Sequence, residues 1–465
     1  MILGVLVLIY GVLFGVLAYK RIEWAVALVV FLLPSYLVRF SVVEVPMTLL
    51  EVMILVLFGV QMYRLVYRWY RSSRDQRLKV KSQKSNYKWL ILLFLLAGGV
   101  GVFVSVDWVA GLGIWKAYFV EPVMFFFVFI NVISRDKLSL ITRAIGGSAL
   151  IVAIPAVVQK FWPIGIENGF WAAEETRRVV SWYGFPNAVG LYLGAIVVLL
   201  IGVSLKSTFD CAQVLGKIKS RSLKGFYILT IILSVLAVLF ARSEGALVGI
   251  IVGVVLLGVV LIPRMRIRGY LLSLVLLAGL LVFLLPGLQE VEDKLLLRDV
   301  SGQIRQQQWD ETAEMLKDGR VLFGSGLSNY QNAIEPYHQE GVWIEDYNDP
   351  DWLKKINRDE EFRKAHWQPV EIYMYPHNFI LNFWVEIGFG GLIVFLFLII
   401  RFIQNYKKCP DESKEMYKIL IIVLMAILVH GLVDVPYFKN DLSVFFWLIM
   451  GMGVVLSEDT RKKFK

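Results

Sequence analysis

Residues 186–205 read PNAVGLYLGAIVVLLIGVSL, twenty residues without a charged side chain. A helix of that length spans the roughly 30 Å hydrocarbon core of a bilayer, because each residue adds about 1.5 Å. The whole chain shares this character, since 57% of its 465 residues are hydrophobic, 18% are charged and the mean hydropathy is +0.64. Soluble domains contain about 45–50% apolar and about 25% charged residues. The composition therefore predicts an all-α, polytopic bundle of transmembrane helices.

Thirteen apolar runs along the chain are predicted to cross the membrane. They are residues 1–19, 22–38, 46–66, 89–106, 114–133, 139–160, 186–205, 225–241, 244–262, 270–286, 376–401, 417–434 and 441–456. We expect the first run to be a retained helix rather than a cleaved signal peptide, because its basic residues, Lys20 and Arg21, follow it. The last run is short, so the expected number of helices is twelve or thirteen.

Basic residues concentrate in every other loop, most clearly in residues 64–88, 206–224 and 407–418. By the positive-inside rule these loops lie in the cytoplasm. This predicts a multi-pass protein of the cytoplasmic (inner) membrane, with the N-terminus outside and the C-terminus in the cytoplasm. The formal charge of +10 is then a marker of topology, and no nucleic-acid partner is expected.

The predicted topology divides the chain into three parts. Residues 1–286 contain ten helices joined by basic cytoplasmic loops, and residues 376–465 contain three helices and a cytoplasmic tail. Between them, residues 287–375 are expected to form one large extracytoplasmic loop domain that is mainly helical. This segment has ten Lys and Arg against eighteen Asp and Glu, a net charge of −8.

Several ionisable residues fall at the predicted outer face of the membrane. A charge in mid-helix costs roughly 2.5–3.5 kcal/mol on insertion scales, so such residues usually pair or line a cavity. Those at the outer face are Arg177, Arg178, Arg242, Glu244, Arg298, Arg305, His377 and Asp434. Arginine binds phosphate oxygens with a planar fork of donors, and histidine exchanges a proton near neutral pH. The set could hold a lipid pyrophosphate and help an acceptor hydroxyl attack the sugar that it carries.

Each of these residues also has a structural interpretation. An arginine at a helix end is commonly an interfacial anchor, and Arg298 could pair with acidic residues of the loop. A single histidine at a helix N-terminus is more often a cap than a base, and His430 lies inside the predicted helix 417–434 without a recognisable partner. Trp309 could belong to an interfacial belt or stack on a sugar ring.

Two further patterns concern helix packing. Gly245, Gly249 and Gly253 recur every four residues, which predicts close packing along the helix 244–262. Glu121 precedes Pro122 inside the run 114–133, which predicts a kink with a buried polar partner and leaves open a place in the cavity.

The second half of the chain resembles the O-antigen ligase and polymerase superfamily. The family signature is an Arg-x-x-x-Trp segment, a Gly-x-Gly turn with a nearby Tyr, and His-Asn at the start of a helix that ends in Glu-x-Gly-x-x-Gly. The corresponding residues are Arg305 to Trp309, Gly324-Ser325-Gly326 with Tyr330, His377-Asn378, and Glu386-Ile387-Gly388 with glycines at 390 and 391. The segment from Arg178 to Asn187 is similar to the family's Arg…Pro-Asn element. The resemblance covers roughly residues 175–400.

The resemblance implies an inverting, metal-independent glycosyltransferase that needs no cofactor. It would move a glycan from a polyprenyl-pyrophosphate donor, which is embedded in the membrane lipid, to a glycan, lipid or protein acceptor. The transfer would take place on the outer side of the cytoplasmic membrane. Arg305 would bind the pyrophosphate and His377 would activate or position the acceptor hydroxyl, so these two are the candidate catalytic residues. The candidate substrate-binding residues are Arg178, Asn187, Arg242, Arg298, Trp309, Tyr330 and Asn378. The sequence does not distinguish a ligase from a polymerase.

The chain departs from the family pattern at one position. It has Ser243-Glu244-Gly245-Ala246 where the family commonly shows Ser-Arg-Gly-Ala, and Arg242 could supply the missing charge.

Two rival functions are also open. A transporter or a flippase for lipid-linked glycans would fit the number of helices and Glu121, but such proteins need charges along a central path. A metal-dependent lipid-phosphosugar transferase would need paired carboxylates in the first outer loop, where residues 39–45 offer only Glu44.

Overall fold

The computed structural model describes residues 2–42, 45–72, 87–208, 221–261 and 289–458. Within these ranges, eight helices are long and apolar enough to cross a membrane, and three further apolar helices are shorter. The two sheets found there are each a single antiparallel pair of short strands. The prediction of an all-α polytopic bundle is therefore confirmed. The predicted helix 270–286 lies outside the described residues.

The first part of the chain contributes most of the bundle. Its elements are α1 (Ile2–Lys20), α2 (Ile22–Phe31), η1 (Leu33–Leu37), β1 (Arg39–Val42), β2 (Val45–Thr48), α3 (Leu49–Ser72), α4 (Lys88–Val104), α5 (Trp108–Trp115), η3 (Lys116–Val120), α6 (Glu121–Val132), η4 (Arg135–Lys137), α7 (Leu138–Phe161), α8 (Gly169–Ala172), α9 (Pro186–Thr208), α10 (Arg221–Ala241) and α11 (Glu244–Leu261).

The second part alternates between short elements and three long helices. Its elements are α13 (Gln289–Leu295), α14 (Val300–Met315), η6 (Leu316–Arg320), α15 (Tyr330–Ile334), η7 (Glu335–Tyr337), β3 (Gly341–Trp343), α16 (Trp352–Arg358), α17 (Glu360–Ala365), β4 (Trp367–Pro369), α18 (Phe379–Asn405), η8 (Tyr406–Lys408), α19 (Asp411–His430) and α20 (Asn440–Ser457).

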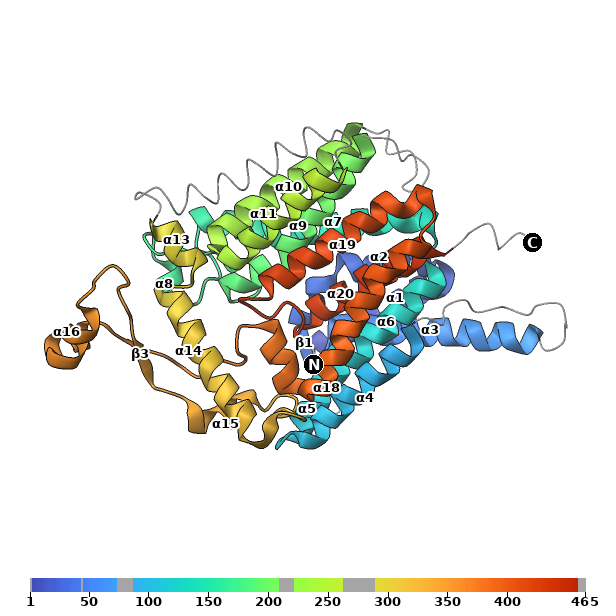
Figure 1. Ribbon diagram of the computed structural model, residues 1–465. Coiled ribbons are helices and arrows are strands. Elements are labelled where there is room, and N and C mark those ends of the chain that lie inside the picture. Colours follow the sequence, from blue (N-terminus) through green and yellow to red (C-terminus); the bar gives the residue numbers. More distant parts are fainter. Residues whose placement is uncertain (1, 43–44, 73–86, 209–220, 262–288, 459–465) are drawn as a thin grey trace.

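Helices from distant parts of the sequence interleave in the bundle (Figure 1). α7, α9 and α10 pack side by side, α11 packs against α9 and α19, α20 packs against α6, and α18 packs against α4. Within an 18-residue apolar stretch of each helix, 78% of the stretch in α9 and 83% of that in α20 is buried inside the protein. These two helices therefore form the centre of the bundle.

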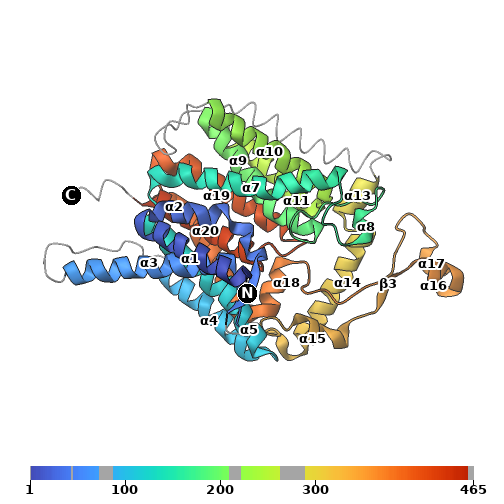
Figure 2. The same ribbon diagram turned by 180° about the vertical axis from the view of Figure 1, so that it is seen from behind.

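The segment from α13 to β4 gathers at one end of the bundle (Figure 1), and Figure 2 shows α16 and α17 together at its far tip. The view from behind shows the same segment, with α14 running beside the start of α18 (Figure 2). β3 and β4, which flank α16 and α17 in the sequence, pair antiparallel with Val342 opposite Gln368.

Several predicted spans have wrong boundaries. The predicted helix 22–38 ends at Phe31, because Pro34 lacks an N–H and opens a 3-10 helix instead. The predicted helix 376–401 begins at Phe379 and is broken at Gly388, whose backbone is left-handed with a φ of 72°. The predicted helix 417–434 runs from Asp411 to His430.

The predicted helix 114–133 also differs from the structure, since helical backbone extends from Trp108 to Val132. A π-helical turn, η3, lies just before Glu121, and Lys116 in that turn forms an ion pair of 2.5 Å with Glu51. Glu121 is buried beside this pair. The predicted polar partner of Glu121 is thus present.

The Gly324-Ser325-Gly326 turn contacts the bundle from residues 289–375, which are called the outer segment after the location that the sequence predicts for them. The N–H groups of Ser325 and Gly326 donate to the Val385 carbonyl at 2.8 and 3.3 Å, and the Leu327 N–H donates to the Gly101 carbonyl at 2.9 Å. A Cβ on Gly326, whose φ is 89°, would lie 2.5 Å from the Ser105 nitrogen. These contacts hold the outer segment against α4 and α18, and thereby position α14.

Candidate functional site

α14 carries three of the side chains that build the site. Asp299 caps the helix by accepting a hydrogen bond from the Gly302 N–H at 3.1 Å. Arg305, Gln308 and Trp309 follow at helical spacing, so they project from one face of α14. This face meets the segment that leads into α18.

Two hydrogen bonds dock α14 on that segment. Trp309 donates its indole N–H to the Pro376 carbonyl at 2.8 Å. The Gln308 amide donates from Nε2 to the Tyr375 carbonyl at 3.2 Å. The structure thus brings together the Arg-x-x-x-Trp segment and the His-Asn pair, which are about 70 residues apart in the sequence.

The imidazole of His377 is held in one tautomer by Gln308. Because Nε2 of Gln308 donates to Tyr375, its Oε1 is the atom that faces His377 Nδ1, at 3.0 Å. An amide oxygen only accepts, so Nδ1 carries the proton and Nε2 carries the lone pair. No described residue hydrogen-bonds to Nε2. Nε2 is therefore available to take a proton from a substrate.

The surroundings of His377 favour its neutral form. Burial lowers the pKa of His377 below its ordinary value of 6.5, the Asp434 carboxylate opposes this shift, and Arg305 adds to it. The rings of Tyr373 and Tyr375 lie against the imidazole, with centroids 5.0 and 5.5 Å away. At pH 7 the neutral form of this side chain is therefore favoured.

The charge of Arg305 interacts with residues from several segments of the chain. Its guanidinium donates to the Ser301 hydroxyl at 2.8 Å, one turn earlier on α14. It lies within electrostatic range of His377, Arg178 and His430, which come from three different segments. Arg305 is thus close enough to Arg178 and to His377 for their charges to interact.

Arg178 belongs to the loop before α9, and its side chain reaches the end of α10. Its guanidinium donates to the Ala241 carbonyl at 3.0 Å, the Asn187 side-chain oxygen at 3.0 Å and the Arg242 carbonyl at 3.3 Å. Burial lowers the pKa of Arg178, Glu244 raises it, and Arg242 and Arg305 lower it further. The arginines repel one another, so an anion between them would be bound favourably.

Arg242 lies at the exposed edge of this cluster. Its backbone is left-handed, with a φ of 50°, and that of His377 is left-handed as well, with a φ of 42°. Such conformations cost about 1–3 kcal/mol each outside glycine and gather at functional sites. Glu244, which replaces the family's arginine, forms an ion pair of 2.8 Å with Lys294 of α13.

Three candidate residues have structural partners away from this cluster. Arg298 pairs with Glu292 at 3.7 Å and lies 5.0 Å from the centre of the Tyr347 ring. Tyr330 is buried in the outer segment, where its hydroxyl hydrogen-bonds Thr312 at 2.8 Å. Asn378 caps α18 by accepting from the Ile380 and Leu381 N–H groups, and donates to the Leu432 carbonyl at 3.0 Å.

Two residues outside the predicted set lie at this site. Gln308 lies inside the Arg-x-x-x-Trp segment and contacts His377, and its spacing from Arg305 is the signal that the sequence offers. His430, for which the sequence predicts a structural role, ends α19 close to Asp434. Asp434 is buried and within electrostatic range of His377 and His430.

The candidate site contains arginine and histidine groups rather than a cluster of acidic ligands. Among the residues that the structure describes, no group of three or more His, Cys, Asp or Glu could hold a metal ion.

Comparison with known families identifies part of the chain. Residues 229–396 match the family model described as O-antigen ligase. This part of the chain, roughly a third of its length, is similar to that family. This confirms the resemblance to the O-antigen ligase and polymerase superfamily. No curated protein matches the chain.

The matched residues include Arg242, Arg305 and His377. The match begins in α10 and ends within α18, so Arg178 and His430 lie outside the matched residues. The candidate site therefore combines the matched residues with the loop before α9 and the end of α19.

Proposed function

We propose that the protein is a glycosyltransferase of the O-antigen ligase and polymerase type. It transfers a glycan from a polyprenyl-pyrophosphate donor to an acceptor hydroxyl of a glycan, lipid or protein. The observation that carries this proposal is the open Nε2 of His377 beside a cluster of mutually repelling arginines. This arrangement offers a base for the acceptor and a cationic site for a departing diphosphate.

The transfer is a single displacement at the anomeric carbon of the donor's first sugar. The acceptor oxygen forms the new bond to that carbon while its proton passes to Nε2 of His377. The bond between the anomeric carbon and the diphosphate oxygen breaks, and the electron pair leaves with the polyprenyl diphosphate. One displacement inverts the configuration at this carbon.

The arginines stabilise the charge that develops on the leaving group. Arg305 and Arg178 are fixed by hydrogen bonds to Ser301, Asn187 and main-chain carbonyls, so their positive charges need little rearrangement during the reaction. Hydrogen bonds to charged groups are worth about 1.5–3 kcal/mol each. Arginines can therefore neutralise the diphosphate without a divalent ion.

The basic loops support a reaction on the outer side of the cytoplasmic membrane. The site lies beside the acidic outer segment, and the strongly basic loops lie at the other ends of the helices in the predicted topology. A lipid-linked donor would reach the site from the bilayer with its diphosphate at the interface.

The test is glycan transfer by the purified full-length protein from a lipid-linked oligosaccharide. His377→Ala should lower the rate at least about 100-fold, because a general base contributes about 10²–10⁴ in rate. Arg305→Ala should lower it to a similar degree, because removing one group that stabilises developing charge costs about 10²–10³. Arg358→Ala is the matched control, since this arginine is exposed on α16. Normal rates in both site variants would contradict the proposal.

The same assay addresses the finer points. Activity that persists in chelator supports the metal-independent mechanism, and loss that Mg²⁺ restores would overturn it. A ladder of products indicates a polymerase and a single product indicates a ligase. Movement of the donor across the membrane without transfer would favour the flippase.

A further inference from the structure

The loop before α9 carries Arg178 and folds back on itself. Arg178 at its start donates to the Asn187 side-chain oxygen at its end, at 3.0 Å. Between them the Tyr183 N–H donates to the Val180 carbonyl at 3.0 Å and closes a tight turn. Ser181 in this turn has left-handed backbone, with a φ of 52°. Such backbone at a residue other than glycine is strained and persists only where the surrounding contacts hold it.

Gln159 of α7 is the side chain that holds this turn. Its Oε1 accepts hydrogen bonds from the N–H groups of Val180 and Ser181, at 3.0 and 2.7 Å. Its Nε2 donates to the carbonyls of Ser181 and Ile164, both at 3.0 Å. A glutamine amide has two donor and two acceptor positions, so these contacts use all four. Glutamate, which has the same length, lacks the two donors.

The amide of Gln159 serves the loop and not the helix that carries it. Gln159 lies near the end of a membrane-spanning helix and is 5% exposed. A buried polar group is unfavourable unless it is hydrogen-bonded, so an apolar side chain would suit α7 itself better. All the hydrogen-bond partners of this amide belong to residues that follow α7 in the sequence.

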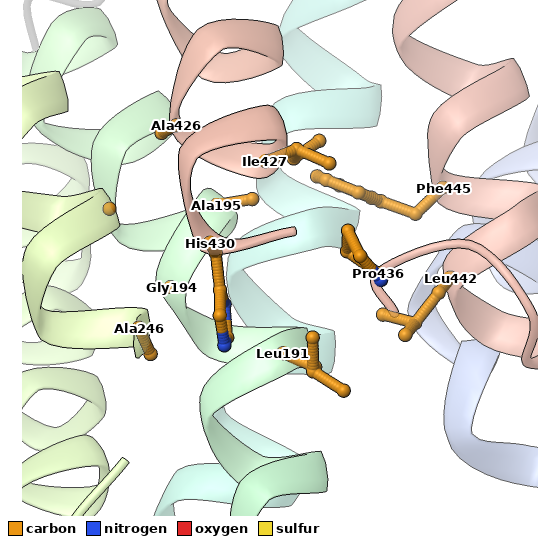
Figure 3. Close-up of a pocket in the computed structure, with 11 residues that line it drawn as sticks. Leu191, Gly194, Ala195, Ala246, Ala426, Ile427, His430, Pro436, Leu442 and Phe445 are labelled. Atoms are coloured by element: carbon orange, nitrogen blue, oxygen red, sulfur yellow. The ribbon is translucent and has the colours of Figure 1, made fainter. Parts of the chain in front are cut away.

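A second anchor holds the turn from α20. The Tyr183 hydroxyl donates to the Asp441 carboxylate at 3.1 Å, and the Lys439 ammonium lies 3.6 Å from the centre of the Tyr183 ring. Leu191 of α9 and Leu442 of α20 line the same small pocket, so the beginnings of these two helices lie side by side (Figure 3). The turn is thus held from two sides, by α7 and by α20.

The held turn decides where the Arg178 guanidinium lies. Arg178 also donates to the Ala241 and Arg242 carbonyls at the end of α10, so the loop and α10 together fix its direction. Asn187 is the third partner only while the turn brings the two ends of the loop together. If the turn loosened, Arg178 would keep its charge but lose its fixed position.

We propose that Gln159 is a positioning residue for Arg178. By holding the turn at Val180 and Ser181, it keeps the guanidinium in the place where it binds the diphosphate of the donor. The inference rests on the proposed function, and it assigns the order of that site to a side chain that does not touch the substrate. A charge that is already fixed needs little rearrangement, so it stabilises the diphosphate better than a mobile one.

The test is a double-mutant cycle on the purified full-length protein in detergent, with inorganic pyrophosphate as the ligand. Arg178→Ala should weaken pyrophosphate binding about 10- to 100-fold, because it removes a hydrogen bond to a charged group. Gln159→Leu, which has a similar size but no amide, should weaken it about tenfold by misplacing the guanidinium. The double variant should bind no more weakly than Arg178→Ala, because Gln159 acts through Arg178. Losses that multiply would overturn the inference.

Hydrogen exchange of the loop provides a readout that does not depend on the ligand. In Gln159→Leu the amides of Val180 and Ser181 should exchange at least about tenfold faster than in the wild type, because they lose their acceptor. Ser148→Ala is the matched control, since it removes a buried hydrogen bond between α7 and Tyr192. It should change neither the exchange of the loop nor the affinity. Faster exchange in Gln159→Leu with unchanged affinity would overturn the inference.

A milder variant covers the case in which Gln159→Leu does not fold, as judged by thermal unfolding. Gln159→Glu keeps the oxygen that accepts from Val180 and Ser181 but cannot donate to the two carbonyls. Its affinity for pyrophosphate should lie between those of the wild type and Arg178→Ala. Wild-type affinity in Gln159→Glu would then overturn the inference.

These measurements also separate the inference from the proposed function. If the wild type transfers glycan while Gln159→Leu keeps normal affinity and exchange, the function stands and the inference fails. If no transfer occurs but pyrophosphate binding depends on Arg178 and Gln159 as a coupled pair, the proposed reaction is wrong and the inference stands. If the wild type does not bind pyrophosphate, or if Arg178→Ala binds it normally, the inference is overturned.

Discussion

At the scale of single residues, Gln308 controls which nitrogen of His377 is available. Its amide contacts both Tyr375 and His377, so a side chain without this amide would let the imidazole turn or change tautomer. We expect Gln308→Leu to lower kcat at least about tenfold with a smaller change in KM for the donor. Gln306→Leu on the same helix is the control. Equal kcat values for the Gln308 variant and the wild type would show that the contact is only structural.

The protonation of His377 predicts the pH dependence of transfer. Because burial lowers the pKa of His377, the base form persists below pH 6.5, and the acid limb of kcat/KM should have its midpoint below that value. The Asp434 carboxylate raises this pKa, so Asp434→Asn should move the acid limb to lower pH. The pH profile of both proteins measures this. An acid limb that moves to higher pH in the variant would contradict the assignment.

The sequence identifies which types of side chain gather near this site, but it does not show which of them contact one another. Charge type and position relative to the membrane placed Arg178, Arg305 and His377 among eight candidates, and the family resemblance singled out Arg305 and His377. Nothing in the sequence distinguished these from Asn378, whose amide caps α18, or from Tyr330, which packs inside the outer segment. Cap, core and ligand residues share the same amino-acid types, so tertiary contacts are needed to separate them.

At the scale of elements, the Gly-x-Gly motif acts as a joint between the outer segment and the bundle. Gly326→Ala should destabilise the protein by about 3–5 kcal/mol, because left-handed backbone costs about 1–2 kcal/mol and the overlap with Ser105 adds more. Gly319→Ala is the matched control, since its φ is also positive, at 76°, but no atom lies within 4 Å of the added Cβ. Thermal unfolding in detergent measures both, and equal melting temperatures would contradict the overlap.

Hydropathy along the sequence predicts where most helices lie, but not where their backbone departs from regular α-helix. Apolar length located most spans, but it could not place the break at Gly388 or the π-helical turn before Glu121. Both depend on neighbours, since the Phe389 N–H bonds to the Leu322 carbonyl at 3.1 Å and Lys116 pairs with Glu51. Local sequence does not contain these partners.

At the scale of the whole molecule, the direction of insertion decides which compartment the site faces. The basic loops predict that the segment 287–375 is outside and that the loop 407–418 is in the cytoplasm. Two exposed lysines, Lys354 on α16 and Lys407 in η8, report on the two sides. If the orientation were reversed, His377 and the arginines would face the cytoplasm, and an outer-surface acceptor could not reach them.

Single cysteines test this orientation in a background without Cys211 and Cys409. Lys354→Cys should react with a membrane-impermeant maleimide in intact cells, because its residue lies on the exposed tip of the outer segment. Lys407→Cys should react only after the membrane is permeabilised, because a charged reagent does not cross the bilayer. Both variants must retain glycan transfer to serve as reporters. Labelling of Lys407→Cys in intact cells, with Lys354→Cys protected, would place the site in the cytoplasm and contradict transfer at the outer face.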